Sequence, residues 1–138
     1  YQYMKINDRE VGEQAVDAAC AGAHGVPVIC VASDDKGVKE GLEFFPGTET
    51  VTTKQAMGWN FAISKHPLRV VDEIAAATER AAAKAKELSP FKFDEPLSVE
   101  IRYKRIEAAE AASRGLRRGT RVGPYTVRWE LQSLSDYF

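Results

Sequence analysis

The pattern of apolar and polar positions predicts a parallel arrangement in the first part of the chain. The apolar run over residues 26–32 is too short for a helix and predicts a strand covered on both faces. The β-branched segment over residues 48–54 predicts the next strand, and KGVKEGLEFF between them predicts a helix. A strand, a helix and a strand in this order imply a right-handed crossover between parallel strands.

The residues before this crossover predict a hairpin followed by a helix. Residues 1–11 contain two short strand-like stretches on either side of Asn7 and Asp8. These two residue types tolerate left-handed backbone in turns. A helix is predicted from about Gly12 to Ala23, because Gly25 behind it is a typical C-terminal cap.

After residue 54 the pattern shifts to a long helix and then to alternating strands. Residues 55–66 fit either a loop or a short helix. Residues 68–88 are rich in alanine and charged helix formers and predict the longest helix. Residues 97–103 and 125–131 alternate apolar with polar positions, which predicts antiparallel strands with one buried face. A helix is predicted between them.

The predicted fold class is therefore α/β, with a parallel βαβ-containing lobe followed by a smaller α+β lobe with antiparallel strands. We expect the first lobe to span residues 1–90 and the second to span residues 91–138. The length of 138 residues and the hydrophobic fraction of 44% suffice for one domain or two small lobes.

Charge and hydropathy bear on the possible partners. Lys and Arg number 19 and Asp and Glu number 20, whereas non-specific nucleic-acid binding needs a basic surplus. The most basic stretch, residues 114–121, is interpreted as a solvated loop. No apolar segment approaches the ~20 residues that cross a bilayer. We therefore expect neither nucleic acid nor membrane as a partner.

The two cysteines, Cys20 and Cys30, lack the CxxC spacing of a zinc or redox site. We interpret both as small buried apolar residues without a disulfide. Two free thiols fit a reducing compartment, so the expected location is the cytoplasm.

Polar residues follow the two predicted parallel strands, where ligands bind in parallel α/β sheets. Asp34 and Asp35 follow the first strand, and Lys54 follows the second. These side chains predict a polar pocket wall. Aspartates in this place are also frequent helix N-caps, and Lys54 equally fits a solvated surface residue.

Glu13 is a candidate metal ligand that spacing alone does not support. Glu10, Glu13 and Asp17 would share one face of a helix, and three like charges on one stripe usually indicate a solvated face. Zinc needs three or four ligands. Neither His24 nor His66 has a partner at the spacing of a metal site.

Other catalytic patterns are missing from the sequence. It contains no GxSxG elbow, no GxxxxGK[ST] loop and no GxGxxG loop. Trp59 and Trp129 are interpreted as packing residues. The residues by themselves predict an α/β domain with an acidic pocket.

Three stretches nevertheless resemble a known family, the zinc-dependent D-aminopeptidases of the DppA type. They are INDREVGEQAVDAACAGAHGVPVICVASDD, FFPGTETVTTKQA and the HP pair before the long helix. The family carries V-G-E, then a helix ending in A-G-x-x-G-V-P-V, then a strand and D-D. The likeness continues in pattern from LSVEI to VRWEL and so spans nearly the whole chain.

The resemblance implies that Glu13, the glutamate of V-G-E, binds one ion of a two-zinc centre. Asp34, Asp35 and Lys54 would then support the metal site or line the substrate pocket. The family's other zinc ligands lie in an N-terminal S-x-D-x-E-G motif and on two later histidines, and its proposed catalytic histidine also precedes V-G-E. None of these is present here, so we expect the C-terminal half of such an enzyme, inactive when isolated.

The implied function is hydrolysis of N-terminal residues, D-amino acids among them, from short peptides by a ring-forming homo-oligomer. The alternative is a non-catalytic α/β module that binds a small ligand or serves as an assembly surface. The family often has an arginine in the segment where this chain has Gly58, Trp59 and Asn60, which leaves the substrate preference open.

Overall fold

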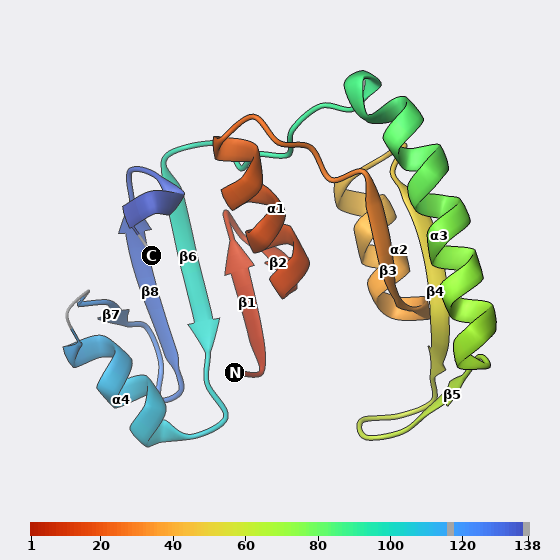
Figure 1. Cartoon of the computed structure of the whole chain (residues 1–138). Coiled ribbons are helices and arrows are strands. Elements are labelled where there is room, and N and C mark those ends of the chain that lie inside the picture. Colours follow the sequence, from red (N-terminus) through yellow and green to blue (C-terminus); the bar gives the residue numbers. More distant parts are fainter. Residues whose placement is uncertain (116–117, 137–138) are drawn as a thin grey trace. The chain divides into compact units, whose positions relative to one another are not determined.

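The computed structural model describes residues 1–115 and 118–136 and contains two compact units. One unit combines Tyr1–Cys20 with Lys92–Phe138, and the other is formed by Ala21–Phe91. The α-helices and strands of both units are labelled in Figure 1. Part of the basic stretch predicted as a solvated loop lies outside the described residues.

This division differs from the expected one, in which the whole of residues 1–90 formed the first lobe. Tyr1–Cys20 groups with the C-terminal strands because strand β1, Tyr3–Ile6, pairs with strand β6, Leu97–Arg102. Their buried side chains follow one register, in which Ile6 lies opposite Val99. The first strands therefore complete the antiparallel sheet.

The first unit contains a five-stranded antiparallel sheet in the order β2-β1-β6-β8-β7. Its remaining strands are β2 (Arg9–Val11), β7 (Thr120–Arg121) and β8 (Thr126–Leu131), and helix α4 (Ile106–Arg114) precedes β7. In β6 the buried residues are Leu97, Val99 and Ile101, at every second position. This alternation confirms the prediction of antiparallel strands with one buried face.

The turn between β1 and β2 is built on Asn7 and Asp8, as predicted. Both have positive φ, 51° and 63°, the conformation that a tight two-residue hairpin requires. The Asn7 side chain donates to the Asp94 carbonyl oxygen at 2.7 Å and accepts from the Ser98 N–H at 2.9 Å. The turn is thereby tied to the start of β6.

Helix α1, Glu13–Ala23, also begins and ends close to its predicted bounds. Gly25 has φ +75°; its N–H donates to the Gly22 carbonyl, and the Val26 N–H donates to the Ala21 carbonyl. These two bonds form the Schellman motif, which satisfies the last carbonyls of a helix. The apolar side of α1 buries Ala15, Val16, Ala18 and Ala19.

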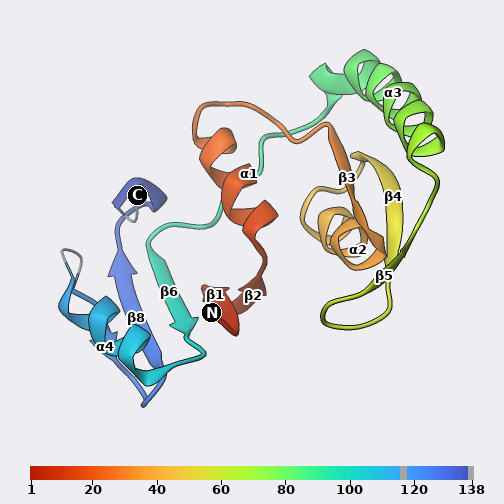
Figure 2. The same ribbon diagram turned by 60° about the horizontal axis from the view of Figure 1, so that its bottom comes forward.

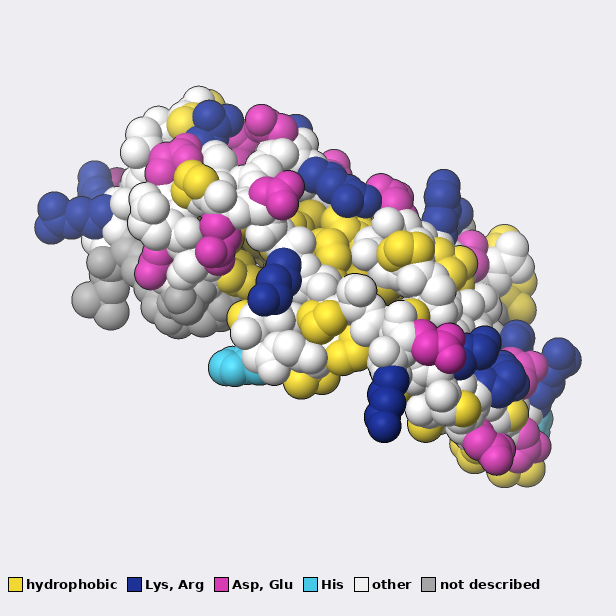
Figure 3. Space-filling view, turned by 90° about the horizontal axis from the view of Figure 1, so that it is seen from above, with side chains coloured by type: hydrophobic (Ala, Val, Ile, Leu, Met, Phe, Trp, Pro, Cys, Tyr) yellow, Lys and Arg dark blue, Asp and Glu magenta, His cyan; other side chains and the backbone are white. Residues whose placement is uncertain are grey.

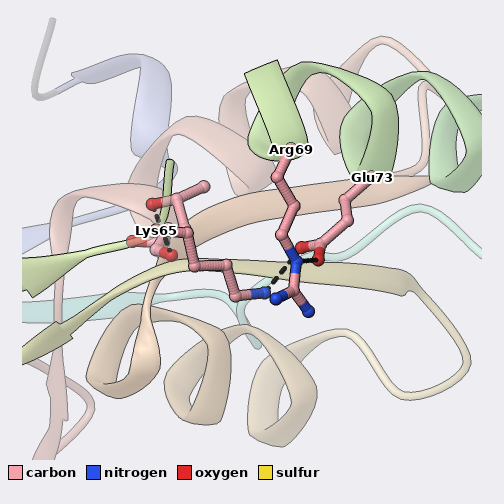
Figure 4. Close-up of polar contacts among 5 residues, drawn as sticks. Lys65, Arg69 and Glu73 are labelled. Carbon is pink, nitrogen blue, oxygen red and sulfur yellow. Dashed lines mark hydrogen bonds and ion pairs between the residues drawn. The ribbon is translucent and has the colours of Figure 1, made fainter. Parts of the chain in front are cut away.

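The second unit contains a three-stranded sheet in the order β3-β4-β5. Its elements are β3 (Cys30–Asp34), α2 (Asp35–Phe44), β4 (Glu49–Ala56), β5 (Ala62–Ser64), α3 (Pro67–Lys84) and the 3₁₀ turn η1 (Ala85–Glu87). The β3–β4 pair is parallel and the β4–β5 pair is antiparallel. Helices α2 and α3 lie on opposite faces of the sheet (Figure 4). The predicted parallel βαβ unit is confirmed.

Strand β3 begins at Cys30, four residues later than predicted from the apolar run. Gly25 completes the cap of α1, and Pro27 has no N–H to donate to a strand ladder. The predicted cover on both faces is only partial: α2 and α3 lie on opposite faces of the sheet (Figure 4), but the residues of β3 are half-buried or exposed. Among the described residues, β3 is an edge strand of its sheet.

Three phenylalanines pack together in the second unit. The Phe91 ring lies edge-on to Phe44 and Phe45, with ring centroids 5.6 Å and 5.3 Å away. Phe44 is the last residue of α2, Phe45 is its C-cap, and both are buried. Such edge-to-face pairs add about 0.5–1.5 kcal/mol each beyond the area they bury. The cluster therefore fixes Phe91, the last residue of the unit, to α2.

The surface mixes charges of both signs. On the face shown in Figure 3, Lys and Arg side chains lie among Asp and Glu side chains. Within the described part of the chain, no helix has the length and apolar character to span a membrane.

Candidate functional site

The structure brings the predicted pocket residues Asp34, Asp35 and Lys54 to one end of the parallel strand pair. Asp34 is the last residue of β3 and its register partner on β4 is Lys54. Asp35 begins α2. The prediction that Lys54 follows its strand was wrong, because β4 continues to Ala56 to pair with β5.

Asp34 is the N-cap of α2. One carboxylate oxygen accepts from the N–H groups of Lys36, at 3.1 Å, and Gly37, at 2.8 Å. An N-cap of this kind stabilises a helix by about 1 kcal/mol. The capping interpretation is therefore confirmed for Asp34, although the side chain also lines a hollow.

Asp35 holds the far end of β4. Its Oδ1 accepts from the Ala56 N–H at 2.7 Å, and its Oδ2 lies 3.7 Å from the Lys36 ammonium. The Ala56 hydrogen bond is the main cause that lowers the pKa of Asp35, with a smaller contribution from the charge of Lys36. The carboxylate is consequently ionised at neutral pH and committed to the backbone.

Two hollows open beside these residues, and Lys54 contributes to both. The larger, about 370 Å³, is lined by Asp35, Thr52, Lys54, Gln55, Ile63, Ser64 and Lys65. The smaller, about 230 Å³, is lined by Asp34, Lys54, Ala56, Gly58, Trp59, Asn60, Phe61 and Ala62. Each places a carboxylate, an ammonium group and apolar atoms around one opening, a combination that suits a short zwitterionic molecule.

The two lysines of the larger hollow differ in their partners. Lys65 Nζ lies 2.5 Å from Glu73 Oε2, and Arg69 Nε lies 2.8 Å from the other oxygen (Figure 4). The hydrogen bond from Lys65, followed by that from Arg69, lowers the pKa of Glu73. Lys54 forms no ion pair or hydrogen bond with any described side chain. Its charge is therefore available to a ligand.

The connection between β4 and β5 is the feature that sequence reasoning missed. Residues 55–66 form neither a plain loop nor a short helix but the turn and second strand of a hairpin. Trp59 is 80% exposed, so its interpretation as a packing residue was wrong, whereas Trp129 is 7% exposed and is indeed packed. Gly58 and Asn60, two turn-forming residues between apolar stretches, were the available signal.

Glu13, the predicted metal ligand, is exposed at the first position of α1 in the other unit. A carboxylate in the first turn also stabilises the helix through its dipole, by about 0.3–1 kcal/mol. The expected helical stripe was wrong, since Glu10 lies on β2 opposite Lys5. Asp17 is exposed on α1.

The metal-binding capacity of the described residues is limited. They contain no group of three or more His, Cys, Asp or Glu side chains placed to hold a metal ion. His24 and His66 are both exposed, and the two cysteines are free thiols. A zinc ion needs three or four donors, so Glu13 fits only as one donor of a larger set.

Comparison with known proteins identifies relatives over nearly the whole chain. The model of peptidase family M55, described as D-aminopeptidase, matches residues 1–138. A D-aminopeptidase of Bacillus subtilis (strain 168) is 31% identical over 142 residues, which cover 99% of this chain and 50% of that protein.

A solved structure agrees with this match. It is the Zn-dependent D-aminopeptidase DppA from Bacillus subtilis, described as a self-compartmentalizing protease. Its TM-score is 0.87 at 26% sequence identity, with 96% of this chain and 48% of that chain covered. The chain thus spans about half the length of the relatives it matches.

Proposed function

The chain belongs to peptidase family M55, the D-aminopeptidases, and we propose that it forms part of a zinc-dependent aminopeptidase. The substrates are short peptides from which the enzyme removes the N-terminal residue, D-amino acids included. The observation that carries this proposal is the family match, which extends from the first residue to the last.

The proposal gives Glu13 the role of one donor in a centre of two zinc ions. The V-G-E motif of the resemblance ends at this residue. Its carboxylate is exposed and bonded to no described side chain, so it is available to a metal. Zinc supplies an activated water and a polarised carbonyl in peptide hydrolysis. The remaining donors are not found together among the described residues.

Lys54 is proposed to orient the peptide. Its ammonium group lines both hollows without a partner among described side chains and can bind a substrate carboxylate. Asp34 and Asp35 shape the same openings while capping α2 and holding Ala56. Their part is to position the walls of the pocket.

The proposed protein is a cytoplasmic homo-oligomer. The support for the location is the pair of free thiols, which fits a reducing compartment. The support for the assembly is the self-compartmentalizing relative. A ring of copies would enclose the sites and admit only short peptides.

The test compares Glu13→Gln with Asp17→Asn in the gene product that carries this chain. Both remove one exposed carboxylate charge from α1. We expect Glu13→Gln to lower zinc content, measured by elemental analysis, and peptide hydrolysis together, whereas Asp17→Asn retains both. Full zinc and full activity in Glu13→Gln would refute the assignment of Glu13.

A non-catalytic binding or assembly module is the second candidate. It is favoured by the missing donor cluster among the described residues. Hydrolysis of short peptides by the gene product excludes it. Binding of such peptides without turnover, together with no bound zinc, supports it.

A further inference from the structure

The turn and second strand of the β4–β5 hairpin carry a row of exposed apolar side chains. We call residues 57–63 the aromatic hairpin. Trp59 is 80% exposed, Phe61 66%, Ile63 61% and Met57 47%. The four lie at every second position of the sequence. In Figure 2 the connection between β4 and β5 projects beyond α2.

The aromatic hairpin is an ordered surface. The Met57 N–H donates to the Phe61 carbonyl at 3.2 Å and closes the turn. A Cβ on Gly58 would lie 2.5 Å from the Phe61 ring, so the ring lies against this glycine. Asp35 holds Ala56, the residue before the turn. These contacts order the turn and the Phe61 ring, which lowers the entropy lost when a partner covers them.

The aromatic hairpin also carries no charged side chain. Residues 55–64 contain no acidic or basic side chain, in a chain of which 28% is charged. Proteins usually protect an edge strand with charged residues or proline. Strand β5 is an edge strand among the described residues and has neither. An uncharged surface meets a second copy of itself without repulsion between like charges.

The exposed apolar area of the aromatic hairpin suits association between copies of the chain. A covered Trp or Phe side chain buries about 150–250 Å², so the exposed fractions of Trp59, Phe61, Ile63 and Met57 together offer roughly 500 Å². A stable interface takes about 800 Å² from each partner. The hairpin alone supplies more than half of that area.

From these observations we infer that the aromatic hairpin is a contact surface between copies of this chain, with Trp59 and Phe61 as its anchors. The inference rests on the proposed homo-oligomer and locates one of its interfaces. Because Trp59 and Phe61 also line the smaller hollow, the test reads assembly mass and not hydrolysis.

The experiment measures assembly mass against concentration by light scattering and sedimentation in the gene product that carries this chain. Trp59→Ser with Phe61→Ser should weaken the association about 100-fold or more, because buried aromatic anchors each contribute about tenfold or more. Leu42→Gln is the matched control, since Leu42 is an exposed apolar residue of α2 in the same unit, at 46% exposure. It should leave the mass unchanged.

Trp59 also reports what covers it. Its fluorescence emission, obtained by subtracting the spectrum of Trp59→Phe from that of the wild type, should shift to the blue as copies associate. An unchanged mass in the double variant, or a monomeric wild type at every concentration, would overturn the inference.

Two further outcomes also overturn it. A buried Trp59 signal in the monomer means that another segment of the same polypeptide covers the hairpin. A Trp59 shift that follows added dipeptide but not protein concentration, at constant mass, means that the rings serve the ligand pocket and form no interface. If the double variant loses its assembly and the wild type does not hydrolyse peptides, the proposed peptidase alone is refuted. The inferred interface is then still supported.

Discussion

The Asp35 carboxylate accepts a 2.7 Å hydrogen bond from the backbone N–H of Ala56, which joins the first residue of α2 to the last residue of β4. Ala56 directly precedes the aromatic hairpin, and Asp35 directly follows Asp34, the N-cap of α2. One polar contact therefore links the pocket wall to the start of the aromatic hairpin.

Removing this contact should loosen the hairpin. Asp35→Ala leaves the Ala56 N–H without its acceptor, and we expect its hydrogen exchange to accelerate about tenfold or more. Asp35→Asn keeps an acceptor oxygen and should exchange at an intermediate rate. Lys36→Ala is the control, because it removes only the 3.7 Å ion pair. Equal protection of Ala56 in all three variants would contradict the anchoring role.

Gly22 should tolerate no side chain. A Cβ built there would overlap the carbonyl oxygen of Phe91, so Gly22→Ala must displace the aromatic cluster. Overpacking of this kind costs about 1–3 kcal/mol, measurable as a shift of the urea unfolding midpoint.

Gly25 provides a contrast in mechanism. A Cβ built at Gly25 would have no described atom within 4 Å, so only the φ of +75° disfavours a side chain there. Gly25→Asn should therefore cost less than Gly25→Ala, because asparagine tolerates this backbone region. Equal losses for the two substitutions would indicate a steric rather than a conformational cause.

The Glu100–Arg128 pair should make stability depend on acid pH. Arg128 Nη2 lies 2.7 Å from Glu100 Oε2 between directly paired residues of β6 and β8. The hydrogen bond from Arg128 is the largest cause that lowers the pKa of Glu100, with help from the Tyr3 hydroxyl. The stabilisation is thus present above the unfolded-state pKa of about 4.3 and is lost as pH falls through the lowered folded-state pKa.

Glu100→Gln tests whether the pair stabilises the fold at neutral pH and loses this effect in acid. The variant should lose stability at neutral pH and show a flatter decline between about pH 5 and pH 2. Glu107→Gln, which alters an exposed carboxylate on α4, should keep the wild-type slope. A steeper acid decline in Glu100→Gln than in the wild type would reverse our assignment.

Lys54→Met should weaken peptide binding more than turnover. The ammonium group lines both hollows, so its loss should raise KM about tenfold with little change in kcat, as expected for uniform binding. Lys39→Met, an exposed lysine of α2, is the control. A fall in kcat at constant KM would instead place Lys54 in the chemical step.

The elements that depend on local chemistry were predictable from the sequence. The turn at Asn7 and Asp8, the cap at Gly25 and the alternation of β6 all follow from residue types at fixed spacing. The pairing of β1 with β6 was not predictable, because no local pattern reveals that Ile6 lies opposite Val99. The late start of β3 had a signal in Pro27 that the apolar run obscured.

The candidate site shows the same limit. Asp34, Asp35 and Lys54 were brought together by the rule for strand ends, but the Asp35–Ala56 hydrogen bond depends on a hairpin that the sequence analysis left open. The metal role of Glu13 came from resemblance, since the described residues contain no group of three or more donor side chains placed to hold a metal ion.

The most direct measurement of the central claim uses the gene product that carries this chain and a pair of dipeptides that differ only in the configuration of the N-terminal residue. We predict that the D-configured peptide is cleaved, that chelation abolishes cleavage, and that added zinc restores it. Cleavage that persists after complete removal of metal, or no cleavage of either peptide by the zinc-loaded protein, would contradict the proposed zinc-dependent D-aminopeptidase.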